Sequence, residues 1–536
     1  MIFFELLYLL SAILLAAYGL NSIFHTGQYW RLRRRKAGSD SASESPQATP
    51  DRETPYDWPI VTVQLPVYNE RHVAVRLIET VARLDWPADR LQIQVLDDST
   101  DDTTQIVAAA ARLKSDNQQR MVNGEHLIAN GCWIEHVRRA DRQGYKAGAL
   151  QAGLASAQGE FVAIFDADFM PEPDFLQRTI PSFDDPDVGC VQARWGHVNR
   201  NTSQFTRAQA LGIDGHFVVE QRVRSAIGAF LNFNGTAGVW RRACMDDVGG
   251  WEGDTLTEDL DLSYRAQLAG WRIDYRPDVV APAELPVQVD AFKRQQFRWA
   301  KGSIQTAIKL WGRLWRSPEP LWRKVLSSLH LTNYLVHPLM IINLFLLLPI
   351  SFSNSPLLHL APLLALVAIG PPLMYLTAMQ AQGESLWRRP FHLGALMALG
   401  TGLSLNNTKA VYEAVRGVQS EFKRTPKFAV IDRPANQASG PVADPPAGWQ
   451  ESAYALPRNP IVWAELTLAI YALGLLVYCL WAGVWWVSFW VLLYVSGYSY
   501  IAGLAFVQAW QLRSARNGDR DRLRIERIRR EQPDYL

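Results

Sequence analysis

The sequence predicts an α/β domain joined to an α-helical membrane bundle, and three observations lead to that fold class. The chain has 536 residues, which is too long for one compact core. In its N-terminal half, β-rich runs alternate with helical stretches, a pattern typical of a parallel sheet with helices on both faces. Long apolar stretches at the N-terminus and in the C-terminal half are typical of membrane helices. We therefore expect an α/β domain attached to about five transmembrane spans, with interfacial helices beside them.

Five apolar segments are long enough to cross the hydrocarbon core of a bilayer, which is about 30 Å thick, as helices. They are residues 2–23, 328–352, 356–379, 461–483 and 484–507. A buried core helix can be equally apolar, but five such segments in one chain favour membrane insertion. The stretch 391–410 is interrupted by Gly and Asn, so it is predicted to be an interfacial or re-entrant helix.

Basic residues around these segments predict which side of the membrane each part occupies. Residues 31–36 hold five Lys and Arg, and the tail at 513–530 is also basic. Positively charged segments stay in the cytoplasm, so the N-terminus is expected outside and the α/β domain in the cytoplasm. The expected location is the inner or plasma membrane, with the lipid bilayer as a partner and the tail on anionic lipid. A net charge of +2 does not suggest nucleic-acid binding, and none is expected.

The chain is accordingly divided into membrane, cytosolic and linker parts. Two stretches are rich in Pro and in small or polar residues, a composition typical of linkers. The predicted parts are an N-terminal span (1–23), a basic anchor and disordered linker (24–58), the α/β domain with interfacial helices (59–327), two spans (328–379), an interfacial segment (380–431), a Pro-rich linker (432–460), two further spans (461–507) and a basic cytosolic tail (508–536).

Acidic residues follow two of the expected strands. The expected strands are residues 60–66, 91–98, 133–137 and 160–168. Asp97 and Asp98 end the second of them, and Asp166 and Asp168 end the fourth. Ligands of parallel sheets bind beyond the carboxyl ends of the strands. Carboxylate oxygens at that edge suit Mg²⁺ or Mn²⁺ bound to nucleotide phosphates, although Asp is also a common helix cap.

Two further motifs carry charged groups ahead of helices. In "TLTEDLDLSYRAQLAGW", Glu258 and Asp259 are candidates for a general base, with a helix-capping box as the alternative. In "RRADRQGYKAGALQAGL", Arg142 and Lys146 precede a helix of small residues, where they can meet phosphate. A solvated basic loop is the alternative for that second motif.

The stretch "QQFRW" places Gln295, Arg298 and Trp299 within about one helical turn, so they can present one surface. Arg298 offers a planar fork that suits a diphosphate. Trp299 offers a flat face for stacking on a sugar, and Gln295 can hydrogen-bond sugar hydroxyls. An amphipathic interface helix anchored by Arg and Trp is the alternative.

In this order, the motifs Asp97-Asp98, Asp166-Ala167-Asp168, Thr257-Glu258-Asp259 and Gln295–Trp299 resemble those of the processive, inverting glycosyltransferases of family 2. That family includes the cellulose, chitin and hyaluronan synthases. The resemblance covers about residues 60–427. "QLPVYNE" at 64–70, "YKAGAL" at 145–150 and "FLNFNGTAGVWRR" at 230–242 are more similar to the cellulose-synthase-like A and C branch and its bacterial relatives. The resemblance implies a cytosolic domain of the GT-A type, a Rossmann-like α/β fold.

The resemblance also implies a role for each matching residue. Tyr68 and Glu70 would flank the nucleotide base, Asp97 and Asp98 would hold the nucleoside, and Lys146, Asp166, Gln295 and Arg298 would bind the rest of the nucleotide sugar. Asp166 and Asp168 would bind the metal. Asp259 would be the base, with Glu258 beside it. The acceptor would lie along Asn234, Gly235, Thr236 and Trp299.

A last match lies at "FKRTPK", which is similar to the family's gating-loop pattern F-x-V-T-x-K. Phe422, Thr425 and Lys427 fit it, whereas Arg424 replaces the Val. The resemblance implies that this loop closes over bound nucleotide, with Thr425 and Lys427 on the diphosphate.

The function implied is processive polymerisation of a β-linked glucan, mannan or glucomannan and its translocation across the membrane. The partners implied are UDP-glucose or GDP-mannose, a growing glycan, and Mg²⁺ or Mn²⁺ as cofactor. Two alternatives stay open. One is a non-processive family 2 transferase that moves a single sugar to a lipid or short acceptor. The other is a nucleotide-sensing transporter, because Glu465 within an apolar segment is typical of transporters.

Overall fold

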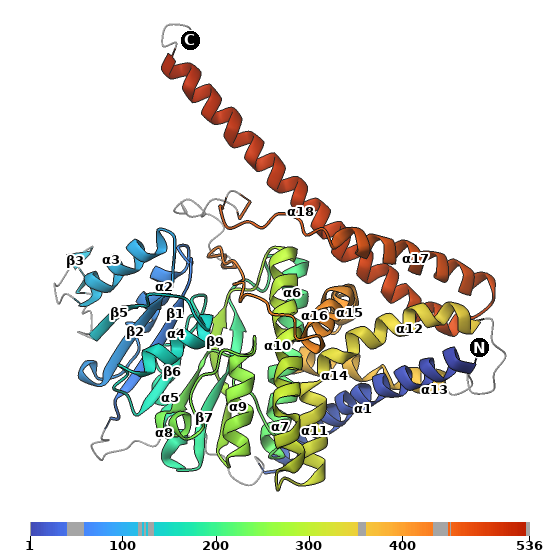
Figure 1. Ribbon diagram of the computed structural model, residues 1–536, viewed down its shortest axis with the longest axis horizontal. Helices are drawn as coiled ribbons and strands as arrows, with labels where there is room; N and C mark the ends of the chain where they lie inside the picture. Colours follow the sequence, from blue (N-terminus) through green and yellow to red (C-terminus); the bar gives the residue numbers. More distant parts are fainter. Residues whose placement is uncertain are drawn as a thin grey trace.

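The computed structural model describes residues 2–39, 58–115, 121–122, 125–126, 133–351, 361–432, 449–450 and 452–531. Figure 1 shows an α/β domain on one side and a bundle of long helices on the other. The first helix of the chain, α1 (Ile2–Ser39), lies with the bundle and not with the domain that follows it. The two halves predicted from the sequence are thus confirmed.

A mixed sheet of seven strands forms the centre of the α/β domain. Its order is β5 (Trp133–Arg138), β2 (Leu91–Asp97), β1 (Val61–Val67), β6 (Phe161–Ile164), β8 (Gly238–Arg241), β7 (Val188–His197) and β9 (Arg272–Ala283). The first four are parallel, β8 is antiparallel to both neighbours, and β7 and β9 are parallel to each other. The predicted strands therefore coincide with β2, β5, β1 and β6, although β6 ends at Ile164, before the two aspartates.

The alternation of residues in β1 explains how this strand is covered on both faces. Val61, Val63 and Leu65 are fully buried on one face, in the largest apolar core. Thr62 and Gln64 are on the opposite face and are equally buried. Thr62 donates to Gln92 Oε1 at 2.7 Å, and Gln64 Nε2 donates to Gln94 Oε1 at 3.1 Å. Paired side chains let a polar face be buried beneath a helix without loss of hydrogen bonds.

Helices surround the sheet and lead from it to the membrane bundle. In the domain they are α2 (Ala74–Val81), α3 (Thr103–Ser115), α4 (Tyr145–Leu154), α5 (Phe175–Thr179), α6 (Gln204–Asp214), the π-helix η3 (Gly215–Gln221), α7 (Arg222–Ala226), α8 (Arg242–Asp247) and α9 (Glu258–Leu268). Short 3-10 turns occur at η1 (Ala88–Arg90), η2 (Ile180–Asp184) and η4 (Asn333–Leu335), and a two-stranded ribbon at β3 (Met121–Val122) and β4 (Glu125–His126). The helices α10 (Val289–Arg316) and α11 (Leu321–Leu331) follow β9 and lie between the sheet and the bundle.

Within the described residues, five helical stretches are long and apolar enough to cross a membrane. They are residues 2–35, 333–351, 364–381, 462–481 and 487–515. They correspond to α1, α12 (Val336–Ser351), α13 with α14 (Ala361–Val367 and Gly370–Ala381), α17 (Val462–Trp481) and α18 (Trp485–Glu531). Figure 1 shows α18 extending far beyond the bundle toward the C-terminus. The five apolar segments predicted from the sequence are therefore membrane-length helices.

The stretch predicted as one interfacial or re-entrant helix forms two helices, α15 (Arg389–Gly402) and α16 (Ser404–Val415). A glycine lets α15 pack closely on α18, since a Cβ added at Gly402 would lie 2.4 Å from the carbonyl oxygen of Gly497. The second helix of the pair, α16, packs against α10 and α12. The pair thereby connects the last membrane helix to the interfacial helix α10.

Residues 40–57 of the first predicted linker and residues 433–448 and 451 of the second lie outside the described residues. The helix α1 continues to Ser39, so the basic run at 31–36 is helical. In the second linker, residues 452–460 pack against the α/β domain and α10: Leu456 N donates to Gln288 Oε1 at 2.9 Å, and His72 Nε2 lies 3.0 Å from Ser452 Oγ.

Candidate active site

A cavity of 150 Å³ opens beyond the carboxyl ends of β1, β2 and β6, and most of the predicted site residues line it. The loops after these strands, the start of α4, the loop before β8, the start of α9, the middle of α10 and the segment after α16 all contribute. The predicted residues that line the cavity are Tyr68, Glu70, Asp98, Lys146, Asp166, Asp168, Asn234, Gly235, Glu258, Asp259, Gln295, Arg298, Trp299, Thr425 and Lys427. Residues from eight separate stretches of sequence thus meet at one edge of the sheet.

Two predicted residues do not line this cavity. Asp97 is 1% exposed; its carboxylate accepts from the Ser99 backbone N at 2.8 Å and lies 2.9 Å from His136 Nε2. Thr236 is fully buried, and its Oγ1 accepts a hydrogen bond from the Asp166 backbone N at 2.9 Å. Both residues hold the loops that carry the lining residues.

The Asp98 carboxylate pairs with Arg139, which is not among the predicted site residues. Arg139 forms a bidentate pair with it, at 3.0 Å from Nε and 2.5 Å from Nη2. Arg142, which was singled out instead, stacks its guanidinium 3.3 Å from the centre of the Tyr68 ring. The basic loop before α4 therefore contacts both the strand-end acid and an aromatic side chain that lines the cavity.

Asp166 and Asp168 each face a lysine. Lys146 Nζ lies 2.5 Å from Asp166 Oδ1 and donates to the Gly235 carbonyl at 2.9 Å. Lys427 Nζ lies 2.6 Å from Asp168 Oδ2. The two carboxylates that are predicted to bind metal therefore have ammonium groups as counter-ions from two different parts of the chain.

Asp259 lies against the glycine of the loop before β8. Gly235 has φ +82°, and a Cβ added there would be 2.8 Å from Asp259 Oδ2. Only glycine combines this backbone conformation with this close approach. Burial, and then the adjacent Glu258, raise the pKa of Asp259 to about 7, while Lys146 opposes the shift. Burial also raises the pKa of Glu258. A carboxyl group with a pKa near neutrality is suited to general base catalysis.

The helix α10 brings the Q-x-x-R-W residues to the same cavity. The Arg298 guanidinium lies 4.3 Å from the centre of the Phe422 ring, and the Trp299 ring lies 6.4 Å from that of Trp195. Burial lowers the pKa of Arg298, whereas Glu258 and other nearby carboxylates oppose that change. At Gly302 an added Cβ would lie 2.7 Å from the Thr257 backbone N, so α10 packs directly on the start of α9.

The residues that follow α16, up to residue 432, form a crossing segment over the cavity. This crossing segment supplies Thr425 and Lys427. The Thr425 Oγ1 is buried and has no hydrogen-bond partner within the described ranges. Arg424, which departs from the family pattern, lies 3.3 Å from Glu70 Oε2 and 4.3 Å from the centre of the Tyr454 ring. Burial raises the pKa of Glu70 to about 8, against the opposing effect of Arg424. The Arg for Val replacement thus provides a counter-ion for a buried acid.

Several residues of this site were missed because their partners come from distant segments. Trp195 contributes from β7, Glu284 bonds the Phe428 backbone N at 2.8 Å, and the Tyr454 hydroxyl bonds Asp101. None of them belongs to a motif with fixed spacing. For Arg139, the sequence does offer a signal, because it belongs to the basic loop before α4.

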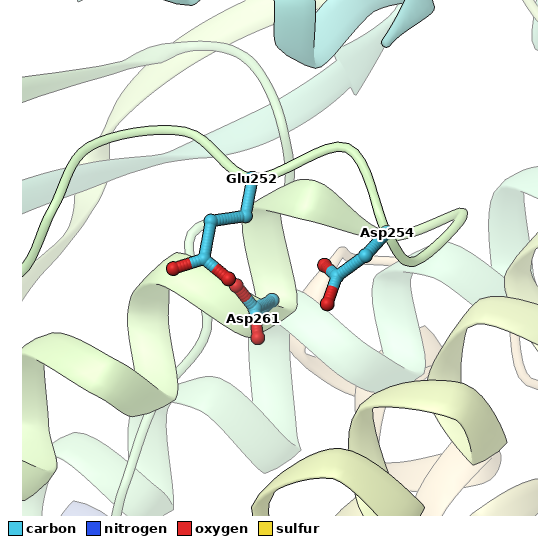
Figure 2. Close-up of side chains that lie close together, drawn as sticks. All are labelled: Glu252, Asp254 and Asp261. Atoms are coloured by element: carbon cyan, nitrogen blue, oxygen red, sulfur yellow. The ribbon is translucent and has the colours of Figure 1, made fainter.

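A second acidic cluster lies outside this cavity. Figure 2 shows the carboxylates of Glu252, Asp254 and Asp261 pointing toward one another. Lys309 Nζ lies 2.5, 2.7 and 3.0 Å from these carboxylates, in the same order. The cluster therefore already holds a cation that belongs to the chain, and the predicted metal residues are elsewhere.

Glu465, the acid within a membrane-length helix, has a structural partner. Its Oε2 lies 2.6 Å from Lys293 Nζ, and both side chains are almost completely buried. Because Lys293 belongs to α10 and Glu465 to α17, this ion pair attaches the helix of the Q-x-x-R-W residues to the membrane bundle. The residue that favoured a transporter is thus accounted for by packing.

A larger cavity of 690 Å³ runs from this site into the helix bundle. It is lined by residues of α1, α6, η3, α10, α12, α14, α15 and α18. The two cavities share Trp195, Ile213, Asn234, Thr257, Asp259 and Trp299. Asp259 and Trp299 therefore lie where the two cavities meet.

Fold and site together define an α/β domain with a charged cavity at the edge of its sheet, joined to a bundle of membrane-length helices. Residues 59–302 match the family described as "Glycosyltransferase like family 2". The α/β domain is therefore similar to this family, over somewhat less than half of the chain.

Two plant proteins are among its curated relatives. "Glucomannan 4-beta-mannosyltransferase 1" of Oryza sativa subsp. japonica is 41% identical over 299 residues, which cover 55% of each chain. "Glucomannan 4-beta-mannosyltransferase 2" of Arabidopsis thaliana is 43% identical over 274 residues, 50% of this chain and 49% of the relative. The chain thus spans about half the length of the curated relatives it matches.

A solved structure with a similar fold is "Mannosyltransferase PcManGT from Pyrobaculum calidifontis in complex with GDP-Man and Mn2+". The two chains share 22% of their sequence, with a TM-score of 0.50 over 78% of this chain and 100% of the other. This likeness confirms the expected GT-A-type fold.

Proposed function

We propose that this protein is a membrane-embedded, inverting glycosyltransferase that builds a β-linked mannan or glucomannan and passes it through its helix bundle. One observation carries the proposal. Asp259 and Trp299 lie where a cavity lined by the strand-end carboxylates joins a second cavity between the membrane helices. A polymer extended at that junction has a path leading away from the site of bond formation.

The donor is GDP-mannose, with UDP-glucose as the second donor of a mixed chain. The names of the plant relatives describe glucomannan mannosyltransferases, and the archaeal neighbour is described with GDP-Man bound. Tyr68 and Asp98, which line the cavity, bind the nucleoside in this proposal. The diphosphate is bound in this proposal by cationic and hydroxyl side chains that line the same cavity, Lys146, Arg298, Thr425 and Lys427.

The residues Asp166 and Asp168 fit a divalent cation, Mg²⁺ or Mn²⁺. They offer hard oxygen ligands one residue apart in the same cavity, where Lys146 and Lys427 now neutralise them. When bound, such an ion neutralises charge on the departing diphosphate. The archaeal neighbour is described with Mn²⁺, which supports this type of cofactor.

Asp259 acts as the base in the transfer. The hydroxyl at the non-reducing end of the acceptor attacks the anomeric carbon from the face opposite the nucleotide, and Asp259 accepts the hydroxyl proton. Arg298 and Lys146 stabilise the negative charge of the leaving diphosphate. Attack on the opposite face inverts the configuration, so an α-linked donor gives a β-linked product. Trp299 stacks on the acceptor sugar and holds it at the junction of the cavities.

The experiment is a donor panel with the full chain in lipid nanodiscs. Labelled GDP-mannose and UDP-glucose are supplied with Mn²⁺, and the products are sized and analysed for linkage. The proposal predicts long β-linked chains that contain mannose. Products extended by a single sugar would favour the non-processive alternative, and nucleotide binding without transfer would favour the transporter.

A further inference from the structure

The larger cavity contains buried acceptor atoms that receive no hydrogen bond from any described residue. His25 of α1 is 1% exposed, and its Nδ1 lies 2.7 Å from the Asn21 carbonyl oxygen. A carbonyl can only accept, so Nδ1 carries the proton and Nε2 is a bare acceptor. His25 Nε2 and Asn21 Oδ1 are both buried without a hydrogen-bond partner among the residues that the structure describes. Both side chains line the cavity, one helical turn apart.

A second wall of the cavity presents Glu220 from η3, which packs against α1. Glu220 Oε2 lies 3.0 Å from His216 Nδ1, and His216 Nε2 lies 3.2 Å from Asn234 Nδ2. The amide of Asn234 is oriented by Gln221, whose Nε2 donates to Asn234 Oδ1 at 3.0 Å. Asn234 Nδ2 therefore donates to His216, and His216 donates to Glu220. The chain of bonds begins at a residue that also lines the active site.

These groups define the chemistry of what fills this part of the cavity. A buried acceptor without a donor costs free energy that a suitable occupant recovers. A lipid acyl chain has no hydrogen to donate, whereas each sugar of a glycan presents several hydroxyl donors. The cavity also begins at Asp259 and Trp299, where the proposed acceptor ends. The occupant is therefore expected to be the glycan itself.

We propose that Asn21, His25 and Glu220 form a binding subsite for a sugar of the acceptor chain that lies beyond the terminal sugar at Trp299. This inference rests on the proposed function and adds a specific role for α1, a helix outside the matched family domain. His25 Nε2 and Asn21 Oδ1 accept hydrogen bonds from hydroxyls of that sugar. The Glu220 carboxylate accepts from hydroxyls on the side of the sugar facing η3.

The test uses acceptors of two lengths, with the full chain in nanodiscs. The variants are His25→Phe and Asn21→Ala, and the matched control is Thr26→Val. Thr26 belongs to the same helix, but among the described residues its hydroxyl donates only to the Ser22 carbonyl oxygen, at 2.9 Å, and it is not a lining residue of the cavity. The acceptors are a monosaccharide and a hexasaccharide with the linkage that the wild-type protein makes. KM is measured for each acceptor and for the donor.

The subsite predicts that KM for the hexasaccharide rises roughly tenfold in each variant, as expected for the loss of a buried hydrogen bond. KM for the monosaccharide and for the donor stay at wild-type values, and Thr26→Val matches the wild type for all three. Direct calorimetric binding of the hexasaccharide weakens by the same factor. An unchanged hexasaccharide KM in both variants would overturn the subsite while leaving the proposed function intact. A wild-type protein that extends neither acceptor would instead overturn the proposed function.

Discussion

At the scale of single residues, the site depends on how closely a carboxylate can approach a glycine. Gly235 has a left-handed backbone conformation and lies directly against Asp259. Gly249 has almost the same φ, +86° against +82°, but an added Cβ there meets no atom within 4 Å. Substitutions at these two glycines can therefore distinguish the effect of backbone strain from the effect of a steric conflict with Asp259.

We expect Gly235→Ala to lose activity and Gly249→Ala to keep it. Each substitution places a side chain on a left-handed backbone and lowers the free energy of unfolding by about 1–2 kcal/mol. Only at residue 235 does the new methyl displace Asp259, and a displacement of about 1 Å at a reacting group costs about a hundredfold in rate. Transfer rates and thermal unfolding of both variants provide the check. Equal activity in the two variants would contradict the contact.

The pH dependence of transfer should follow the protonation of Asp259. The pKa of Asp259 is raised to about 7 by burial and by Glu258, and only the deprotonated form accepts a proton. We therefore expect kcat/KM to be constant above pH 7 and to fall about tenfold per pH unit below it. Glu258→Gln removes the neighbouring negative charge, so the acidic limb of the profile should move to lower pH. A limb that stays in place in Glu258→Gln would show that another group titrates.

How much of the site could be predicted also becomes clear at this scale. Strand-end acids were identified because the edge where parallel strands end is where ligands bind. The sequence could not show which of Asp97 and Asp98 lines the cavity. Their orientation depends on His136 in a neighbouring strand and Arg139 in a loop. Tyr454 was invisible for the same reason: its partners Asp101 and Arg424 come from distant segments.

At the scale of elements, α10 and the segment after α16 connect the site to the membrane. α10 carries Arg298 and Trp299 toward the cavity, and its Lys293 pairs with Glu465 of α17. Lys301 of α10 lies 2.8 Å from Glu413 of α16, just before the crossing segment begins. The break between α15 and α16 could not be read from the sequence, because packing against both α10 and α18 determines it.

The crossing segment supplies a direct test through Lys427. We expect Lys427→Ala to weaken nucleotide-sugar binding roughly tenfold, because an ammonium group that faces Asp168 in the proposed diphosphate site is lost. Lys423→Ala is the control, since Lys423 is exposed in the same segment and does not line the cavity. Calorimetric titration of the donor measures both. Equal affinity in the two variants would exclude Lys427 from the nucleotide site.

At the scale of the whole molecule, the α/β domain and the helix bundle share one continuous space. The smaller cavity holds the charged residues, and the larger one is lined by membrane helices. The sequence predicted both parts, because apolar length and strand alternation are local properties. It could not predict that they open into each other, since that depends on how α1, α10 and α12 pack together.

Polymer length should depend on the width of the larger cavity. Gly400 of α15 lines it, and an added Cβ there meets no atom within 4 Å, so Gly400→Phe would project into the open space. We expect this variant to make short products at a normal initial rate. Gly394→Phe is the control, because Gly394 is exposed on the same helix and outside the cavity. Full-length polymer from Gly400→Phe would argue against passage along this route.

The most direct measurement compares the wild-type protein with Asp259→Asn in the same nanodisc preparation. Polymer formation from labelled donor and calorimetric donor affinity are measured for both. We predict that the substitution reduces transfer by about a hundredfold to ten-thousandfold, the usual contribution of a general base, and leaves donor affinity unchanged. Polymer formation by Asp259→Asn at the wild-type rate would contradict the central claim that this carboxylate drives glycan extension at the entrance to the membrane.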